Sequence, residues 1–208
     1  MDYKVTVIIP YKKDRGWLQQ AIESVPKDCE LILSKGNGNC QQNFNNGIKR
    51  AKGDLIRWLH DDDRLTPNCI EDSIRTFQDQ DCDFIHGNAY QCYEGFHQIT
   101  NTGNIHGRII PYIPPIKHPT LKTQLQKNVI HSMTTMYRRE VFDKVGYMDE
   151  TLQWSEETEF HLRCLHAGLR IGYCDAFLAY YRIHSGQKSN ADHTERMKNR
   201  EAIKSRFR

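Results

Sequence analysis

The sequence predicts an α/β domain built on a mostly parallel sheet with helices on both faces. Residues 5–9 are β-branched and apolar on both faces, as in a central parallel strand. Strand segments at 30–33 and 55–59 alternate with helical apolar spacing at 17–25 and 41–51. Such alternation within about eighty residues favours parallel strands connected by helices that cover both faces of the sheet.

The elements beyond residue 60 follow a less regular pattern. Thr66 is expected to cap a helix that starts at Pro67, and a fourth strand begins at residue 84. Residues 94–125 show recurrent Gly, Asn, His and Pro without helical spacing, which predicts an irregular, functional excursion with a hairpin at 98–110. The remaining expected elements are a strand at 129–137, a helix at 156–167, closing strands at 169–174 and 176–182, and a polar helix at 192–208.

Composition sets limits on the class of protein. The chain has 208 residues with 38% hydrophobic content and a net charge of +3, which suits one domain and an anionic substrate but does not argue for nucleic acid. Its seven cysteines form no C-x-x-C pair, so reduced thiols in the cytoplasm are expected rather than disulfides or zinc. No apolar stretch approaches the ~20 residues of a transmembrane segment.

The most informative feature is the run Asp61-Asp62-Asp63, which directly follows the apolar strand at 55–59. Ligands of open α/β sheets gather at the carboxyl ends of strands, where these side chains would lie. Clustered carboxylates repel one another, and a divalent cation relieves that repulsion. Oxygen ligands suit Mg²⁺ or Mn²⁺. The alternative is a solvated turn that also caps the next helix.

Several motifs occur in a fixed order along the chain. They are Val5-Thr6-Val7-Ile8-Ile9-Pro10-Tyr11, Asn45-x-Gly47, Asp61-Asp62-Asp63, Val145-Gly146-x-x-Asp149-Glu150, Glu156-Glu157-x-Glu159 and Tyr181-Arg182-x-His184. Together they resemble the GT-A fold glycosyltransferases of family 2, over residues 5 to about 190. The chain is also similar to the N-terminal glycosyltransferase domain of a chlorovirus protein, which would imply a glycan made on a viral glycoprotein in the host cytoplasm.

The resemblance implies an enzyme that moves a sugar from a UDP-sugar to an acceptor hydroxyl on a glycan or glycoprotein, with Mn²⁺ or Mg²⁺ and with inversion. A cation held by the aspartates would neutralise the departing diphosphate, and a carboxylate would take the proton of the acceptor hydroxyl. Within a GT-A domain at 1–190, residues 1–93 would form the nucleotide-binding half and residues 94–190 the acceptor and catalytic half. Residues 191–208 would be a basic C-terminal helix or the start of a linker to further domains of a longer polypeptide.

The same resemblance gives the acidic residues their expected roles. The acidic motif of the family can be aligned here in two ways. In the first, Asp61 contacts the ribose and Asp62 holds the metal. In the second, Asp61 and Asp63 form the pair and Asp63 holds the metal. The metal ligands are therefore expected among Asp61, Asp62, Asp63 and His184. Glu157 stands where the family places its catalytic base, usually an aspartate, and Glu156 could exchange roles with it. Both glutamates would also stabilise a helix N-terminus by ~0.3–1 kcal/mol.

Contacts to the nucleotide-sugar are also carried over from the family. The expected binding residues are Pro10, Tyr11, Lys12, Ser34, Asn43, Gly47, Asp61, Asp62 and His131. Two departures stand out: Ser34-Lys35-Gly36-Asn37 replaces the common Asp-Asp-Gly-Ser, and Phe44 replaces a common arginine. The first removes the carboxylate that usually holds uracil. Two alternative functions stay open, a metal-dependent nucleotide phosphohydrolase or nucleotidyltransferase, and a non-catalytic module that binds a nucleotide-sugar.

Overall fold

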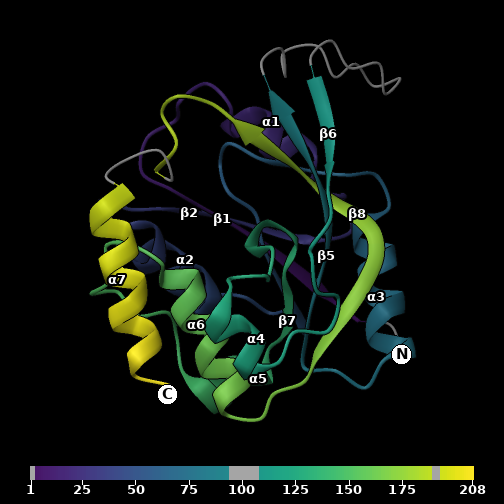
Figure 1. Cartoon of the computed structure of the whole chain (residues 1–208). Coiled ribbons are helices and arrows are strands. Elements are labelled where there is room, and N and C mark those ends of the chain that lie inside the picture. The colour runs from purple at the N-terminus through teal and green to yellow at the C-terminus, as the bar shows by residue number, and fades with distance from the viewer. Residues whose placement is uncertain (1–2, 94–107, 189–192) are drawn as a thin grey trace.

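The computed structural model describes residues 3–93, 108–188 and 193–208 and shows one curled sheet surrounded by helices (Figure 1). The strands are β1 (Val5–Tyr11), β2 (Glu30–Lys35), β3 (Leu55–Trp58), β4 (Arg64–Leu65), β5 (Phe84–Tyr93), β6 (Arg108–Tyr112), β7 (Met136–Arg138) and β8 (Ile171–Ile183). The helices are α1 (Leu18–Glu23), α2 (Cys40–Ile48), α3 (Cys69–Asp79), α4 (Leu121–Gln126), α5 (Glu140–Val145), α6 (Glu156–His166) and α7 (His193–Ser205).

The strand order of the sheet is β2-β1-β3-β7-β5-β8-β4, with β6 paired to β5. Strand β1 is parallel to both β2 and β3, and β5 is parallel to β8. The short β7 lies antiparallel between β3 and β5, so the sheet is mixed rather than uniformly parallel. Since β1 and β3 run in the same direction, Tyr11 and the acidic turn after β3 come to the same edge of the sheet.

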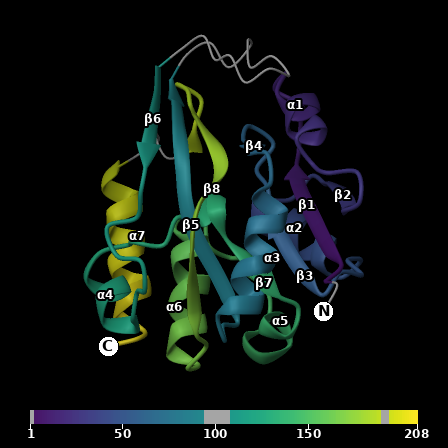
Figure 2. The ribbon, with the colours of Figure 1, turned by 90° about the vertical axis from the view of Figure 1, so that its right-hand side faces the viewer.

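Each face of the sheet has its own hydrophobic core, because successive side chains of a strand point to opposite faces. On one face Val7 and Ile9 pack with residues of α1 and α3. On the other face Ile8 and Ile56 pack with residues of α2, α5 and α6. The expected α/β class with helices on both faces is confirmed. Figure 2 shows β1, β2 and α1 on one side of the molecule and β6, α4 and α7 on the other.

The predicted strands and helices of residues 5–93 are present, but α3 begins at Cys69 and not at Pro67. Thr66 does not cap this helix, because its hydroxyl donates to the carbonyl of Phe177. Three later elements also need correction. The expected strand at 129–137 is a 3-10 turn at 132–134 followed by β7, because the Thr134 hydroxyl donates to the carbonyl of His131 at 2.6 Å and closes the chain locally. The two closing strands are one strand, β8, in which Asp175 and Ala176 bulge out between paired residues.

The third correction concerns the excursion at 94–125, which contains helix α4. The Thr120 side chain caps this helix through the backbone N–H of Thr123, and a cap of this kind starts a helix without an apolar period. The hairpin predicted at 98–110 falls mainly on residues 94–107, which lie outside the described residues, while β6 at its end pairs antiparallel with β5.

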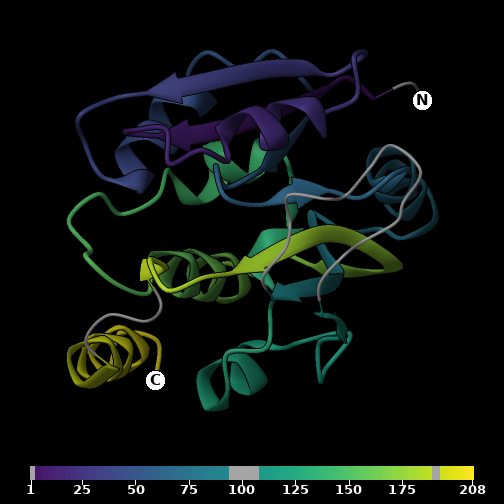
Figure 3. The same cartoon turned by 90° about the horizontal axis from the view of Figure 1, so that it is seen from above.

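Helix α7 packs on the body of the protein, although its sequence predicts little apolar face. Its Ile203 is fully buried and contacts Leu152 and Leu162, the latter from α6. Figure 3, seen from above, shows α7 lying beside α6 at the edge of the molecule. All seven cysteines, each of which is described, are free. Among the described residues, no helix has the length and apolar character that a bilayer span requires.

Candidate active site

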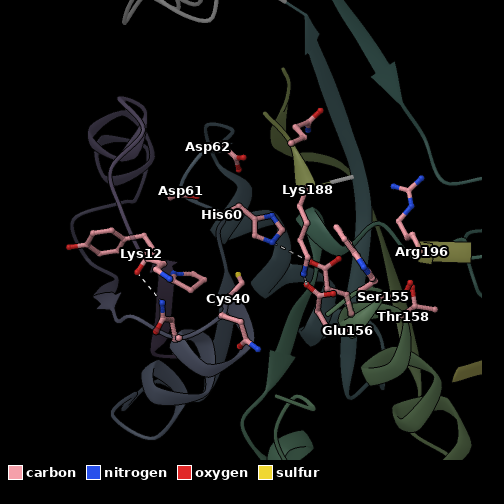
Figure 4. Close-up of a pocket in the computed structure, with 18 of the residues that line it drawn as sticks. Lys12, Cys40, His60, Asp61, Asp62, Ser155, Glu156, Thr158, Lys188 and Arg196 are labelled. Atoms are coloured by element: carbon pink, nitrogen blue, oxygen red, sulfur yellow. Dashed lines mark hydrogen bonds and ion pairs between the residues drawn. The ribbon is translucent and has the colours of Figure 1, made fainter. Parts of the chain in front are cut away.

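A cavity of about 730 Å³ opens at the carboxyl ends of β1 and β3 (Figure 4). One wall is formed by the loop after β1 and the turn after β3, and the opposite wall by the N-terminus of α6 and one face of α7. The predicted residues that line it are Pro10, Tyr11, Lys12, Asn43, Asp61, Asp62, Glu156 and Glu157. The predicted residues that are not among its lining are Ser34, Gly47, Asp63, His131 and His184.

The acidic turn presents two of its three aspartates to the cavity. The backbone N–H of Asp63 donates to the carbonyl of His60 at 3.2 Å, which closes the turn after β3. The side chains of Asp61 and Asp62 are 14% and 16% exposed, and Arg15 Nη2 donates to both, at 2.7 and 2.9 Å. Burial would raise the pKa of Asp62, but the charges of His60 and Arg15 hold this pKa below its ordinary value. Asp62 is therefore an anion in the wall of the cavity.

Asp63 points into the protein and fixes the end of β8. Its side chain is 1% exposed, and its Oδ1 accepts the backbone N–H of Arg182 at 2.9 Å. Arg182 Nε in turn donates to the carbonyl of Asp62 at 2.8 Å. These bonds bring His184 to the turn, with its Nε2 3.1 Å from Asp62 Oδ2. The motif Tyr181-Arg182-x-His184 thus meets the acidic run, although the two are separated by some 120 residues.

His60 was missed from the sequence and lies at the centre of the site. Its Nδ1 is 3.4 Å from Asp63 Oδ2 and its Nε2 is 3.2 Å from Glu157 Oε1. Burial would lower the pKa of His60, but these two carboxylates raise it well above the ordinary value. His60 therefore joins the acidic turn to α6. Its position directly before three aspartates is the signal that could have identified it.

Polar side chains of α2 and the residue before it position the start of α6. Asn45 Nδ2 donates to the carbonyl of Met148 at 2.9 Å, and Gln41 Nε2 donates to that of Leu152 at 2.7 Å. Asn39, the N-cap of α2, holds the same loop through the carbonyl of Glu150. The chain then enters α6 through Ser155, which has a φ of 59°. Because both ends of this loop are held, the first helical residues face the cavity.

The two glutamates at this helix start have different partners. Glu156 Oε1 lies 2.7 Å from Lys188 Nζ, and its side chain is 12% exposed. Burial and the neighbouring charge of Glu157 raise the pKa of Glu156. Burial would also raise the pKa of Glu157, but its contact with His60 holds this pKa below the ordinary value. Glu157 is the more exposed of the two, at 28%, and so is open to a bound acceptor.

Asn43 shapes the opposite end of the cavity. Its Nδ2 donates to the carbonyl of Tyr11 at 3.0 Å and to that of Gly36 at 3.2 Å, so one side chain ties together the ends of β1 and β2. A Cβ atom on Gly36 would lie only 2.2 Å from Asn43 Oδ1, which explains the glycine in this loop. Pro10 and Tyr11 are thereby held at the cavity wall, while Lys12 is exposed beside them.

Three residues that were expected to bind the nucleotide-sugar are instead packed against other parts of the protein. Ser34 is 2% exposed and its hydroxyl accepts from Arg50 Nη2 at 3.0 Å. A Cβ on Gly47 would lie 2.4 Å from Ile8 Cγ2, so this glycine allows α2 to approach β1. His131 is 5% exposed and stacks on Tyr112 at a centroid distance of 3.9 Å. The geometry lends these three residues no support as contacts to a nucleotide-sugar.

The acidic turn has the donor atoms that a divalent cation needs. One ligand atom from each of His60, Asp62 and Asp63 lies within 4.8 Å of the others. Asp63 Oδ2 is buried and takes no hydrogen bond of good geometry from the described residues. The carboxylate oxygens of this group are ligands suited to Mn²⁺ or Mg²⁺. The residues present therefore fit such an ion.

Known proteins with similar sequences are glycosyltransferases by name. The chain is 27% identical over 196 residues to an uncharacterized glycosyltransferase of Rickettsia felis, a match that covers 92% of this chain and 31% of that protein. An uncharacterized glycosyltransferase of Rickettsia typhi is 24% identical over 220 residues, covering 89% of this chain and 66% of the relative. The chain thus spans about one third to two thirds of the length of these curated relatives.

Solved structures share the fold. TarS 1–349 of S. aureus, in complex with UDP-GlcNAc, superposes with a TM-score of 0.67 at 14% sequence identity, over 96% of this chain and 65% of that one. A longer TarS structure gives a TM-score of 0.66 at 16% identity, over 98% and 42% of the respective chains. The model of the family described as glycosyl transferase family 2 matches residues 18–146, more than half of the sequence. The protein therefore has the expected GT-A fold and belongs to glycosyl transferase family 2.

Proposed function

We propose that this protein transfers a sugar from a UDP-sugar to an acceptor hydroxyl, with a divalent cation at the acidic turn and with inversion at the anomeric carbon. The observation that carries the proposal is the pair of acidic walls across one cavity, Asp61 and Asp62 at the strand ends and Glu156 and Glu157 on α6. One wall suits the diphosphate end of the donor, and the other suits the hydroxyl that attacks it. Figure 4 shows Asp61 and Asp62 on one side of His60 and Glu156 on the other.

Asp62 is the carboxylate best placed to hold the cation, together with His184. It faces the cavity, contacts His184 and belongs to the ligand group around His60. This arrangement supports the register in which Asp61 meets the ribose and Asp62 meets the metal, because Asp63 is turned inward. When bound, Mn²⁺ or Mg²⁺ would act as a Lewis acid that neutralises charge on the leaving diphosphate. Asp63 then contributes by holding β8 and His60 in place.

The side chains supply orientation and proton transfer. Glu157 accepts the proton of the acceptor hydroxyl while the hydroxyl oxygen bonds to the anomeric carbon. The bond from that carbon to the phosphate oxygen breaks at the same time, and its electron pair leaves with the diphosphate. Lys12, on the donor side of the cavity, is suited to contact the diphosphate. Because attack and departure occur on opposite faces of the sugar, the product has the inverted configuration.

The donor is proposed to be a UDP-sugar by analogy with the TarS complexes. UDP-GlcNAc and UDP are bound in two of those structures, which share the fold with this chain. Tyr11 is placed to contact the base or ribose from the end of β1. Ser34 brings no carboxylate to the base, so selectivity for uracil would depend on backbone groups of the same loop. The sugar and the glycan or glycoprotein acceptor also belong to the proposal.

One assay separates this function from the two alternatives. The protein is incubated with Mn²⁺ and a panel of UDP-sugars, and UDP, UMP and free sugar are measured with and without excess chelator. Release of UDP that stops with chelator supports the transferase, because slow transfer to water yields UDP and sugar. Release of UMP would support phosphoryl chemistry, and metal-dependent binding without turnover would support a binding module. Unchanged UDP release in chelator would refute the metal-dependent proposal.

The division of the chain and its location in the cell stay predictions. Residues 1–93 contribute the donor side of the cavity, and residues beyond 128 contribute the α6 side, which agrees with a nucleotide-binding half and an acceptor half. Because the relatives are longer, we also propose that further domains follow the helix at 191–208. The cytoplasmic location and the chlorovirus likeness rest on the sequence alone.

A further inference from the structure

Helix α7 turns two arginines toward the cavity, on the same face that anchors the helix. Residues spaced by three or four positions share a helix face, so Arg196, Arg200 and Ile203 are aligned. Ile203 is fully buried against Leu152 and Leu162. Arg200 lies one turn before Ile203 on the same face of the helix, and Arg196 lies one turn before Arg200. Both arginines line the cavity. The inward face of α7 therefore changes from apolar to cationic where it reaches the site.

Placing these two guanidinium groups together carries an electrostatic cost. Burial, and then the charge of Arg196, lowers the pKa of Arg200, so the site disfavours its own positive charge. Arg200 Nε is buried and has no hydrogen-bond acceptor among the described residues. The nearby acid of α7, Glu201, is engaged elsewhere, with Arg208 at 2.9 Å and Lys204 at 3.5 Å. A buried donor without an acceptor is costly unless a ligand supplies the acceptor.

Arg196 lies on the far side of Glu156 from the donor end of the cavity. Figure 4 shows Arg196 on one side of Glu156 and Lys188, and Lys12, Asp61 and Asp62 on the other. A donor diphosphate has its own cations at that end, namely Lys12 and Lys13. Charge at the α7 end must therefore complement the molecule that enters from the acceptor side.

We propose that Arg200 and Arg196 bind an anionic group, a phosphate or a carboxylate, carried by the acceptor. The proposal rests on the proposed transferase function and names the acceptor class: a sugar unit that bears an acidic substituent near the hydroxyl to be glycosylated. Guanidinium groups match the planar geometry of carboxylates and the oxygens of phosphate through paired N–H donors. A hydroxyl of a neutral acceptor could accept from Arg200 Nε, but it would not neutralise the two neighbouring guanidinium charges.

Binding is tested on the whole protein with saturating UDP and Mg²⁺, which occupy the donor end. Glucose 6-phosphate, glucuronic acid and glucose are titrated separately, and the side-chain Nε–H resonance of Arg200 is followed by NMR. We expect the phosphate probe, the carboxylate probe or both to shift this resonance, and glucose to leave it unchanged. Whichever anion binds identifies the phosphate or the carboxylate as the group recognised.

The variants are Arg200→Gln and a matched control, Arg206→Gln, which removes the same charge from the same C-terminal segment outside the cavity, where Arg206 lies 3.7 Å from Asp149. Loss of a hydrogen bond to a charged group should raise the Kd of the anionic probe about 10- to 100-fold in Arg200→Gln. The control should bind as the parent does. Arg200→Lys keeps the charge without the paired donors and should fall between the two. Thermal unfolding of each variant confirms that it is folded.

Three outcomes would overturn the proposal: equal anion binding by Arg200→Gln and the parent, glucose binding as well as the anions, or no shift of the Arg200 resonance with either anion. Displacement of the anion by UDP would also overturn it, because the arginines would then belong to the donor site. Failure of the transferase function is distinguishable, since it would appear as no metal-dependent release of UDP from the UDP-sugars, whereas Arg200-dependent anion binding is measured without turnover.

Discussion

Replacement of Glu157 by glutamine is the most direct test of the chemistry in this cavity. Glu157→Gln keeps the shape of the side chain and removes the oxygen that would accept a proton. Proton transfer by a positioned side chain contributes about 10²–10⁴-fold to a rate. At 1.36 kcal/mol for each factor of ten, we expect the barrier to rise by about 3–5 kcal/mol. Donor affinity should be kept, because Asp61 and Asp62 lie across the cavity.

The neighbouring residue provides the control. Glu156→Gln removes a carboxylate from the same helix turn, but one that is paired with Lys188 at 2.7 Å and only 12% exposed. Its loss should weaken the contact between α6 and the segment after β8, with an effect on kcat below about tenfold if it plays no part in proton transfer. The two variants differ by one position and have the same chemistry, so general effects on folding should be similar.

The assay measures kcat and KM from UDP release with Mn²⁺, and donor affinity from calorimetric titration with UDP. For Glu157→Gln we expect kcat to fall by at least 10²-fold with an unchanged Kd for UDP. Full activity in Glu157→Gln, together with an inactive Glu156→Gln, would refute the assignment and make Glu156 the base. A weakened Kd for UDP in Glu157→Gln would place this residue on the donor side instead.

Three further expectations concern the metal, the packing of α2 and the buried histidines. Asp62→Asn should weaken Mn²⁺-dependent UDP binding by at least ~10-fold in calorimetry, since it removes a charged ligand; unchanged binding would exclude Asp62 as that ligand. Gly47→Ala should lower the free energy of unfolding by about 1–3 kcal/mol in denaturant titration, because the added Cβ meets Ile8 at 2.4 Å, and a neutral effect would contradict this packing. Burial lowers the pKa of three histidines to about 4, namely His86, His131 and His161. In the unfolded chain these histidines take up protons near pH 6.5, whereas in the folded chain they do so only near pH 4. The free energy of unfolding is therefore highest above pH 6.5 and falls toward pH 4, by about 2 kcal/mol per histidine at pH 5. Denaturant titrations that give equal free energies of unfolding at pH 7.5 and pH 5 would contradict this expectation.

The first half of the fold is predictable because its signals are local. β-branched runs and helical apolar spacing alternate from residue 5 onward, and each element buries the face that its pattern marks. The errors fall where long-range contacts decide the structure. β8 is continuous because β5 pairs with it along its whole length, and no local pattern bridges the bulge at Asp175. Helix α4 depends on a cap at Thr120 rather than on an apolar face.

The site divides in the same way. The acidic run and the paired glutamates stand out in the sequence, and Asp61, Asp62 and both glutamates line the cavity. Which aspartate faces outward is decided by the backbone N–H of Arg182, a contact across 119 positions that spacing cannot reveal. Ser34 and Gly47 occupy family positions, yet their surroundings are set by Arg50 and Ile8. The role of a single residue carried over from a family therefore has to be checked against its contacts in the structure. In this chain, the clusters of acidic residues could be assigned to the site from the sequence.

His60 gives a physical reason for a glutamate at position 157, where the family resemblance predicts an aspartate. The longer side chain of Glu157 reaches His60 at 3.2 Å, and His60 is itself held by Asp63. Glu157→Asp would withdraw the carboxylate by about one methylene, and a misplacement of about 1 Å can cost 10²-fold in rate. We therefore expect Glu157→Asp to lose on the order of 10²-fold in kcat, measured as UDP release with acceptor, although it restores the usual family residue. Parent-like activity would mean that His60 does not set the position of the base.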